Sequence, residues 1–236
     1  MQRIMGYMRK AIQEYGMIEP GDRIAVGISG GKDSIALAAG LAGLQKFIGI
    51  PFQLVGVTLD PGWNGQRTDS GPIGQMCESM GMAYHVLETE IGPIVFEARE
   101  ESNPCSLCAR MRRGALHDAA KQFGCNKIAL GHHYDDAVET FVMNLFHEGR
   151  VGCFSPVTYL SRKDLTMIRP LIFAPEREIA SAVRKAGYPI IKIQCPVDGS
   201  TQREWTKNWL RQMEKEQKGI TKRLFGAMKR GHISDW

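Results

Sequence analysis

The feature that most constrains this chain is the segment Gly27–Ser34, which reads GISGGKDS. It follows an apolar run at Arg23–Ile28 that is typical of a buried strand, and it leads into Ile35–Phe47, whose apolar residues have helical spacing. Glycines between a strand and a helix let the backbone approach a ligand closely. The first helical N–H groups and the positive end of the helix dipole then attract anions. The segment therefore predicts an anion site.

The spacing within this loop is not that of an ordinary Walker phosphate loop. Lys32 follows directly on Gly30 and Gly31, whereas the Walker pattern places its lysine after two glycines that are well separated. The alternative is a glycine turn with an incidental lysine. That interpretation leaves the flanking Ser29, Asp33 and Ser34 unexplained, so we favour a ligand-binding loop.

The strand-loop-helix unit is the first of several along the chain. Together they predict an α/β fold in which a twisted parallel sheet is covered by helices on both faces. Strands are predicted at 51–59, 83–87 and 126–130, and helices at 69–80, 91–101, 103–123, 137–146 and 175–187. Ligands bind at the carboxyl ends of such strands, so Asp60, which ends the second strand, should border the pocket.

Length and composition agree with one domain and small additions. The chain has 236 residues, of which 43% are hydrophobic. We expect a docking helix within residues 1–20, the α/β domain at 21–200 and a basic helical segment at 201–236. The chain contains neither an apolar run of membrane-spanning length nor the apolar core of a secretory signal at its start, so we expect a cytoplasmic protein without a membrane partner.

A second informative segment reads Gly131-His132-His133-Tyr134-Asp135-Asp136 and follows the strand predicted at 126–130. Histidines and carboxylates at the carboxyl end of a strand suit phosphate, Mg²⁺ or general-base chemistry. The simpler interpretation is a helix cap in which Asp135 or Asp136 accepts free N–H groups. Both interpretations hold if one carboxylate caps the helix while the other points into the cleft.

The third segment is a CxxC motif at the start of the helix predicted at 103–123. At about 100° per residue, Cys105, Cys108 and Arg112 fall on one side of that helix. Thiols beside a cation at a helix N-terminus favour the thiolate form, which binds metals or attacks sulfur. The motif alone is compatible with half of a zinc site, a redox pair or half of an iron-sulfur site. Cys195, which follows an extended segment at 188–193, is a candidate third ligand, whereas we expect Cys77, Cys125 and Cys153 to be buried or incidental thiols.

The net charge of +5 is concentrated near the end of the chain. Residues 203–230 contain nine lysines or arginines and three glutamates. Such a run is either a solvated helix face or a nucleic-acid surface, and the interleaved Trp205, Trp209 and Phe225 favour the second interpretation without excluding a packed face.

SGGKDS after a strand resembles the PP-loop ATP pyrophosphatases. Five motifs in one order, GISGGKDS, CSLCARMRRGAL, GHHYDDAVETFVMNLFHEG, IRPL and YPIIKIQC, are similar to the tRNA 2-thiocytidine synthetase (TtcA) branch of that superfamily. The resemblance covers nearly the whole chain. It implies an ATP-dependent sulfurtransferase that adenylates the C2 oxygen of an anticodon-loop cytidine and replaces this oxygen with sulfur.

The resemblance also implies cofactors, partners and residue roles. The cofactors are ATP, Mg²⁺ and a 4Fe-4S cluster held by Cys105, Cys108 and Cys195, and the partners are tRNA, a sulfur donor (free sulfide or sulfur derived from a cysteine desulfurase) and, in a homodimer, a second copy. Lys32, Arg112, Asp135 and Asp136 are the catalytic candidates. Arg110, Arg112, Arg113 and the basic C-terminal helices are expected to hold the RNA backbone. The residues expected to bind the nucleotide are Ser29, Gly30, Gly31, Lys32, Asp33, Ser34, Asp60, Gly131 and His132.

Two differences from the branch leave alternatives open. The chain is shorter than many relatives, and it has Asp198 where the branch often has a second cysteine three residues after the first. The acceptor could therefore be another nucleobase or a small molecule, with sulfur either transferred or removed. A protein of another class, an ATP-binding or metal-binding regulator that does not cleave ATP, is the remaining alternative.

Overall fold

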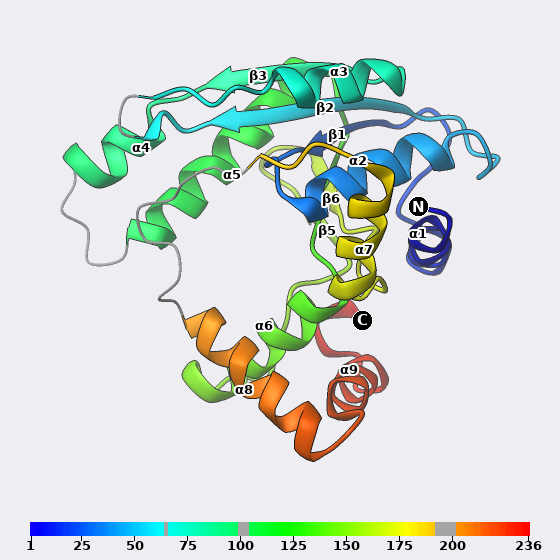
Figure 1. Ribbon diagram of the computed structural model, residues 1–236, viewed down its shortest axis with the longest axis vertical. Helices are drawn as coiled ribbons and strands as arrows, with labels where there is room; N and C mark the ends of the chain where they lie inside the picture. Colours follow the sequence, from blue (N-terminus) through cyan, green and yellow to red (C-terminus); the bar gives the residue numbers. More distant parts are fainter. Residues whose placement is uncertain (64–65, 99–103, 192–201) are drawn as a thin grey trace.

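The computed structural model describes residues 1–63, 66–98, 104–191 and 202–236 (Figure 1). Its sheet has six strands in the order β3-β2-β1-β4-β6-β5. The first five strands in this order run parallel to one another, and the edge strand β5 pairs antiparallel with β6. The strands are β1 (Arg23–Gly27), β2 (Gln53–Asp60), β3 (Ala83–Glu88), β4 (Lys127–Ala129), β5 (Val157–Leu160) and β6 (Leu165–Ile168).

Helices cover both faces of this sheet, and the predicted fold class is confirmed. In Figure 1, α1, α2 and α7 lie on one face, while α5 crosses the other. The helices are α1 (Gln2–Glu14), α2 (Lys32–Leu44), α3 (Gly71–Ser79), α4 (Ile91–Pro93), α5 (Pro104–Gln122), α6 (Tyr134–His147), α7 (Glu176–Ala186), α8 (Gln202–Glu216) and α9 (Ile220–Arg230), with a π-helix η2 (Ile94–Ala98) and a 3₁₀ turn η3 (Ile233–Asp235).

The alternation of side chains along β1 explains the two layers. Ile24 and Val26 point into the larger core, which they share with α1, α2 and α7. Ala25 points the other way and packs against Ala119 and Ala120 of α5. Because successive strand residues face opposite sides, a run that is apolar throughout must be covered on both faces.

Small residues allow α1 to lie close to α2. Met8 and Met5 of α1 contact Gly40 and Gly43 of α2, where a Cβ atom would overlap the methionine sulfur atoms. Met8 is fully buried at this contact. The N-terminal helix is therefore part of the main hydrophobic core.

The structure differs from the sequence predictions in two places. The apolar run before Arg169 is the second strand of an antiparallel hairpin, β5–β6, whose first strand was not predicted because its residues are only half-buried. Of the single helix predicted at 91–101, the structure describes residues 91–98, which form the short α4 followed by the π-helix η2. In the segment predicted to be extended, Ile191 N–H donates a hydrogen bond to the carbonyl of Gly30 (3.0 Å), and residues 192–193 lie outside the described residues.

The basic C-terminal helices pack against α6. Leu210 of α8 lies against Val138 and Val142 of α6, and Tyr134 of α6 contacts Phe225 of α9, with 4.4 Å between ring centroids. This packing places α8 beside α6, the helix that follows β4 (Figure 1).

Among the described residues, none of the helices has the length and the hydrophobicity that crossing a membrane would require.

Candidate active site

A cavity of about 430 Å³ opens at the carboxyl ends of β1 and β4. Four separate segments of the chain line it, namely the end of β1 with the start of α2, the end of β2, one side of α5, and the segment from β4 to the start of α6. Of the predicted site residues, it is lined by Ser29, Asp33, Ser34, Arg112, Gly131, His132 and Asp136. Side chains that are up to about a hundred residues apart in sequence therefore meet where the parallel-sheet topology places a ligand.

The conformation of the loop before α2 is stabilised by hydrogen bonds to its own serines. Ser34 Oγ accepts a hydrogen bond from Ser29 N (3.1 Å) and donates one to the carbonyl of Gly31 (2.9 Å). Gly30 has a φ of +81°, and a Cβ there would lie 2.9 Å from the carbonyl oxygen of Ile191. No described side chain caps the start of α2, so the first-turn N–H groups of α2 are available to an anion.

Gly131 allows the two halves of the cavity to approach each other. A Cβ at this position would lie 3.1 Å from the carbonyl carbon of Asp33 and 3.2 Å from the backbone nitrogen of Ser34. Both atoms belong to backbone and cannot rotate away. A side chain at residue 131 would therefore separate the β4–α6 loop from the first turn of α2.

Lys32 is held by two carboxylates. Its Nζ lies 2.9 Å from Asp33 Oδ2 and 3.0 Å from Glu176 Oε1. Burial alone would lower the pKa of Lys32, but the hydrogen bonds and charges of Asp33 and Glu176 outweigh burial and raise this pKa. The ammonium is therefore charged at neutral pH.

Asp135 and Asp136 have different positions. Asp136 Oδ2 accepts a hydrogen bond from His133 N–H (2.9 Å), and His133 Nδ1 accepts one from Asp136 N–H (3.3 Å), which makes a reciprocal cap at the start of α6. Asp136 also lines the cavity. Asp135 Oδ2 instead accepts the backbone N–H of Glu176 (2.7 Å) and so caps α7.

Two buried polar atoms that face this region lack hydrogen-bond partners among the described residues. They are Asp33 Oδ1 and His132 Nδ1. Burial, and then the nearby Arg169 guanidinium, lower the pKa of His132 to about 4, so its imidazole is neutral at pH 7. An unpartnered carboxylate oxygen suits a cation and an unpartnered imidazole nitrogen suits a polar ligand group, because leaving such atoms buried without partners is costly.

The two thiols of the CxxC motif lie one turn apart on α5. Cys105 is exposed and Cys108 is partly exposed. Ala109 and Arg112, four and seven residues after Cys105, line the cavity, so the helical period places Cys105 on the cavity side of α5. The described residues contain no group of three or more potential metal ligands, and Cys195 lies outside them. The thiols present fit an iron-sulfur ligand pair, because clusters are held by cysteine thiolates.

Asp60 and the remaining cysteines lie elsewhere. The Asp60 carboxylate accepts hydrogen bonds from Gly62 N (3.0 Å) and Thr68 N (2.7 Å), so it organises the loop after β2. Cys77 and Cys125 are buried, and burial raises the pKa of both thiols. Burial also raises the pKa of the Cys153 thiol, to about 12.

Four polar residues close to the site were not found by sequence reasoning: Glu139, Glu176, Arg203 and Lys207. Lys207 Nζ lies 2.8 Å from Glu176 Oε2, and Arg203 Nη1 lies 3.3 Å from Asp136 Oδ1. The sequence around Glu176 predicts only a helix start, and the two cations were assigned to RNA. Their proximity depends on the packing of α7 and α8 around α6.

The comparisons with known proteins agree with this arrangement. Residues 4–215 match the PP-loop domain family. The chain is 39% identical over 230 residues to a tRNA-cytidine(32) 2-sulfurtransferase of Geobacter sulfurreducens, covering 96% of this chain and 89% of the relative. It is 40% identical to the protein of the same name from Geotalea daltonii, covering 96% and 90%. Its fold is similar to that of the U34-tRNA thiolase NcsA from Methanococcus maripaludis, solved with its [4Fe-4S] cluster, with a TM-score of 0.80, 26% identity and coverage of 97% of this chain and 77% of that one.

The parallel sheet and the glycine-serine loop at the head of α2 define an α/β nucleotide-binding domain of the PP-loop class. Within that class the relatives share one name and span nearly the whole chain. The chain belongs to the PP-loop family of tRNA-cytidine(32) 2-sulfurtransferases.

Proposed function

We propose that this protein is an ATP-dependent tRNA thiolase that replaces the C2 oxygen of a cytidine in the anticodon loop with sulfur. By the name of its relatives, the target is cytidine 32. The observation that carries the proposal is the shared cavity. The PP-loop and one side of α5 line the same space, and α5 also carries the two CxxC thiols near its start.

The first half-reaction requires a good leaving group at C2. The C2 oxygen attacks the α-phosphorus of ATP, pyrophosphate leaves, and the base becomes adenylated. Ser29 lines the cavity, and no side chain caps the first-turn N–H groups of α2 among the described residues. We expect these groups to bind the phosphates, and we expect Lys32, which begins α2 but does not line the cavity, to turn toward the phosphates and stabilise the charge that develops on them. The unpartnered Asp33 Oδ1 is a suitable ligand for a Mg²⁺ ion that accompanies the nucleotide.

In the second half-reaction a sulfur nucleophile attacks C2 and AMP leaves. Asp136 lines the cavity and is our candidate to accept the proton of the incoming sulfur, while Arg112 is placed to orient a phosphate or the base oxygen. A 4Fe-4S cluster held by Cys105, Cys108 and Cys195 would supply soft metal chemistry for handling sulfur beside this site. The sulfur itself would come from free sulfide or from a cysteine desulfurase.

RNA would enter beside α5 and the C-terminal helices. Arg112 and Arg113 line the cavity, and Arg110 is exposed on the same helix. None of these three arginines has an ion-pair partner among the described residues, so their charge is available to phosphates.

Nucleoside mass spectrometry of tRNA tests the proposal. Cells without this protein should lack 2-thiocytidine, wild-type protein should restore it, and Lys32→Ala should not. Lys46→Ala, which removes an exposed lysine beyond the end of α2, is the matched control and should restore the nucleoside. Unchanged 2-thiocytidine in the deletion strain would refute the proposed substrate.

A further inference from the structure

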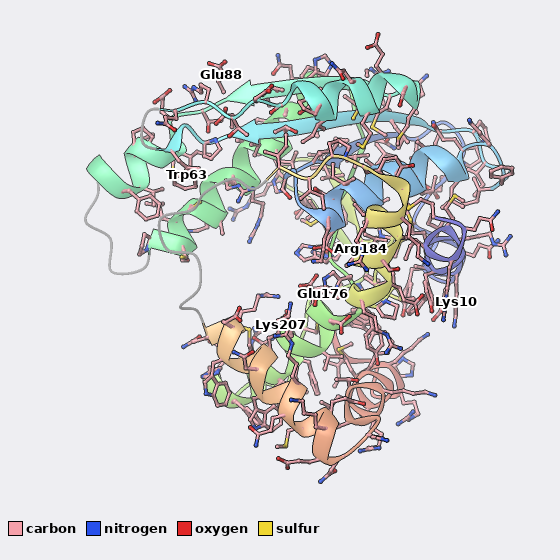
Figure 2. All side chains as sticks on the ribbon, in the orientation of Figure 1. Lys10, Trp63, Glu88, Glu176, Arg184 and Lys207 are labelled. Carbon is pink, nitrogen blue, oxygen red and sulfur yellow. The ribbon has the colours of Figure 1, made fainter. Side chains whose placement is uncertain are left out.

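Lys207 belongs to the basic C-terminal segment, but its ammonium contacts Glu176, which also holds the lysine of the PP-loop. Its Nζ lies 2.8 Å from Glu176 Oε2 and 2.9 Å from Oε1. Glu176 Oε1 also lies 3.0 Å from Nζ of Lys32. One carboxylate at the start of α7 therefore joins the PP-loop lysine to a lysine of α8, and Figure 2 shows Glu176 and Lys207 close together between α7 and α8.

This carboxylate is fixed in place and partly shielded from solvent. The backbone N–H of Glu176 is held by Asp135 (2.7 Å). The side chains of Lys32, Glu176 and Lys207 are 29%, 25% and 25% exposed, so solvent screens their interaction less than it screens a surface ion pair. The arrangement has one anion between two cations.

Removing either cation would change how strongly Glu176 holds the other. With Lys207 present, the charge of Glu176 is shared between two ammonium groups. Without Lys207, Glu176 would attract Lys32 alone and would also repel an approaching phosphate. In the intact protein Glu176 is ionised, because the hydrogen bonds from Lys207 and Lys32 outweigh the effect of burial and lower its pKa to about 2.

We propose that Lys207 is a positioning residue for the ATP site, which neutralises Glu176 so that Lys32 can leave this carboxylate and bind the phosphates of ATP. The inference rests on the proposed function only in that ATP binds at the PP-loop. The proposal gives Lys207 a role that cations of α8 without an ion-pair partner do not have. Lys215, for example, is exposed and has no ion-pair partner among the described residues.

The test is calorimetric binding of α,β-methylene-ATP with Mg²⁺ to the full chain, without RNA. Lys207→Met and Lys207→Gln should each weaken binding about fivefold, as expected for loss of about one partly buried ion pair. Glu176→Gln should tighten binding about threefold, because Lys32 is then released from one carboxylate. The double variant Glu176→Gln/Lys207→Met should bind like Glu176→Gln alone. Lys215→Met removes the same charge from the same helix and should bind like wild type.

The double variant gives the decisive comparison. A double variant as weak as Lys207→Met alone would overturn the proposal, because Lys207 would then act independently of Glu176. Wild-type binding by Lys207→Met and Lys207→Gln would overturn it too. Since RNA is absent, a failure to thiolate tRNA would count against the proposed function and would leave the result on Lys207 unaffected.

Discussion

Asp135 Oδ2 lies 2.7 Å from the backbone nitrogen of Glu176, and this contact fixes the start of α7 to the first turn of α6. The neighbouring Asp136 instead lines the cavity. Two adjacent carboxylates that the sequence could not distinguish therefore have different surroundings. Asp135 holds two helices together, and Asp136 faces the cavity.

Substituting the two carboxylates separately should reveal these roles. Asp136→Asn should lower kcat for tRNA thiolation about 100-fold, the effect of losing a positioned general base. Asp135→Ala should lower the free energy of unfolding by about 1 kcal/mol, as for loss of a helix cap. Urea unfolding and single-turnover thiolation measure the two effects. A larger catalytic loss in Asp135→Ala than in Asp136→Asn would reverse the assignment.

Lys32→Met should lower the rate of pyrophosphate release in the presence of tRNA by about 100-fold, because the phosphates lose their nearest positioned cation. The loss should persist at saturating ATP if Lys32 stabilises charge that develops during the reaction. Coupled detection of pyrophosphate measures this rate. Lys46→Met is the control and should retain wild-type turnover, and an equal loss in this control would mean that the effect is not specific to the loop.

Anaerobic reconstitution with iron and sulfide should give a brown protein with a broad absorption near 400 nm, characteristic of iron-sulfur charge transfer, and about four irons per chain. Cys105→Ala and Cys108→Ala should each abolish this absorption, as should Cys195→Ala. Cys125→Ala removes a buried thiol of the core and should leave the absorption unchanged. Stoichiometric zinc without iron uptake would contradict the cluster assignment.

The contribution of Glu139 to the free energy of unfolding should fall as pH rises, which is the opposite of the usual behaviour of a carboxylate. Burial, and then repulsion from Asp136, raise the pKa of Glu139 from 4.5 to about 7. The folded state therefore binds the proton more tightly than the unfolded state, so this contribution to stability is complete below pH 4.5 and is lost as pH rises to about 7. Glu139→Gln should be more stable than wild type by about 2 kcal/mol at pH 8, with the difference vanishing near pH 4.

Urea unfolding at several pH values measures this difference. Glu148→Gln, at the exposed end of the same helix, is the control and should show little pH-dependent change relative to wild type. A Glu139→Gln variant whose stability relative to wild type does not vary between pH 4 and pH 8 would show that Glu139 titrates normally.

Local signals predicted the ligand loop and the main strands. The glycines and serines around Lys32 act within a few residues of one another, so their spacing alone indicates a strand-loop-helix unit. The hairpin β5–β6 was missed because its first strand is short and only half-buried. The contacts of Glu176 with Lys32 and Lys207 join three helices, α7, α2 and α8. The spacing of residues within any one of these helices does not predict a contact between different helices. The role of Cys195 stays a prediction, since it lies outside the described residues.

Helix α5 carries both the CxxC thiols and residues that line the cavity, such as Arg112. The number of residues between them therefore determines how the thiols are oriented relative to the cavity. Each residue of an α-helix adds about 100° of rotation and 1.5 Å of rise. One residue inserted between Cys108 and Arg112 would turn the thiols by more than a quarter of a circle away from the cavity, with almost no change in length. The number of residues in α5 thus fixes both the spacing and the relative direction of its side chains, and natural insertions should be confined to the loops at its ends.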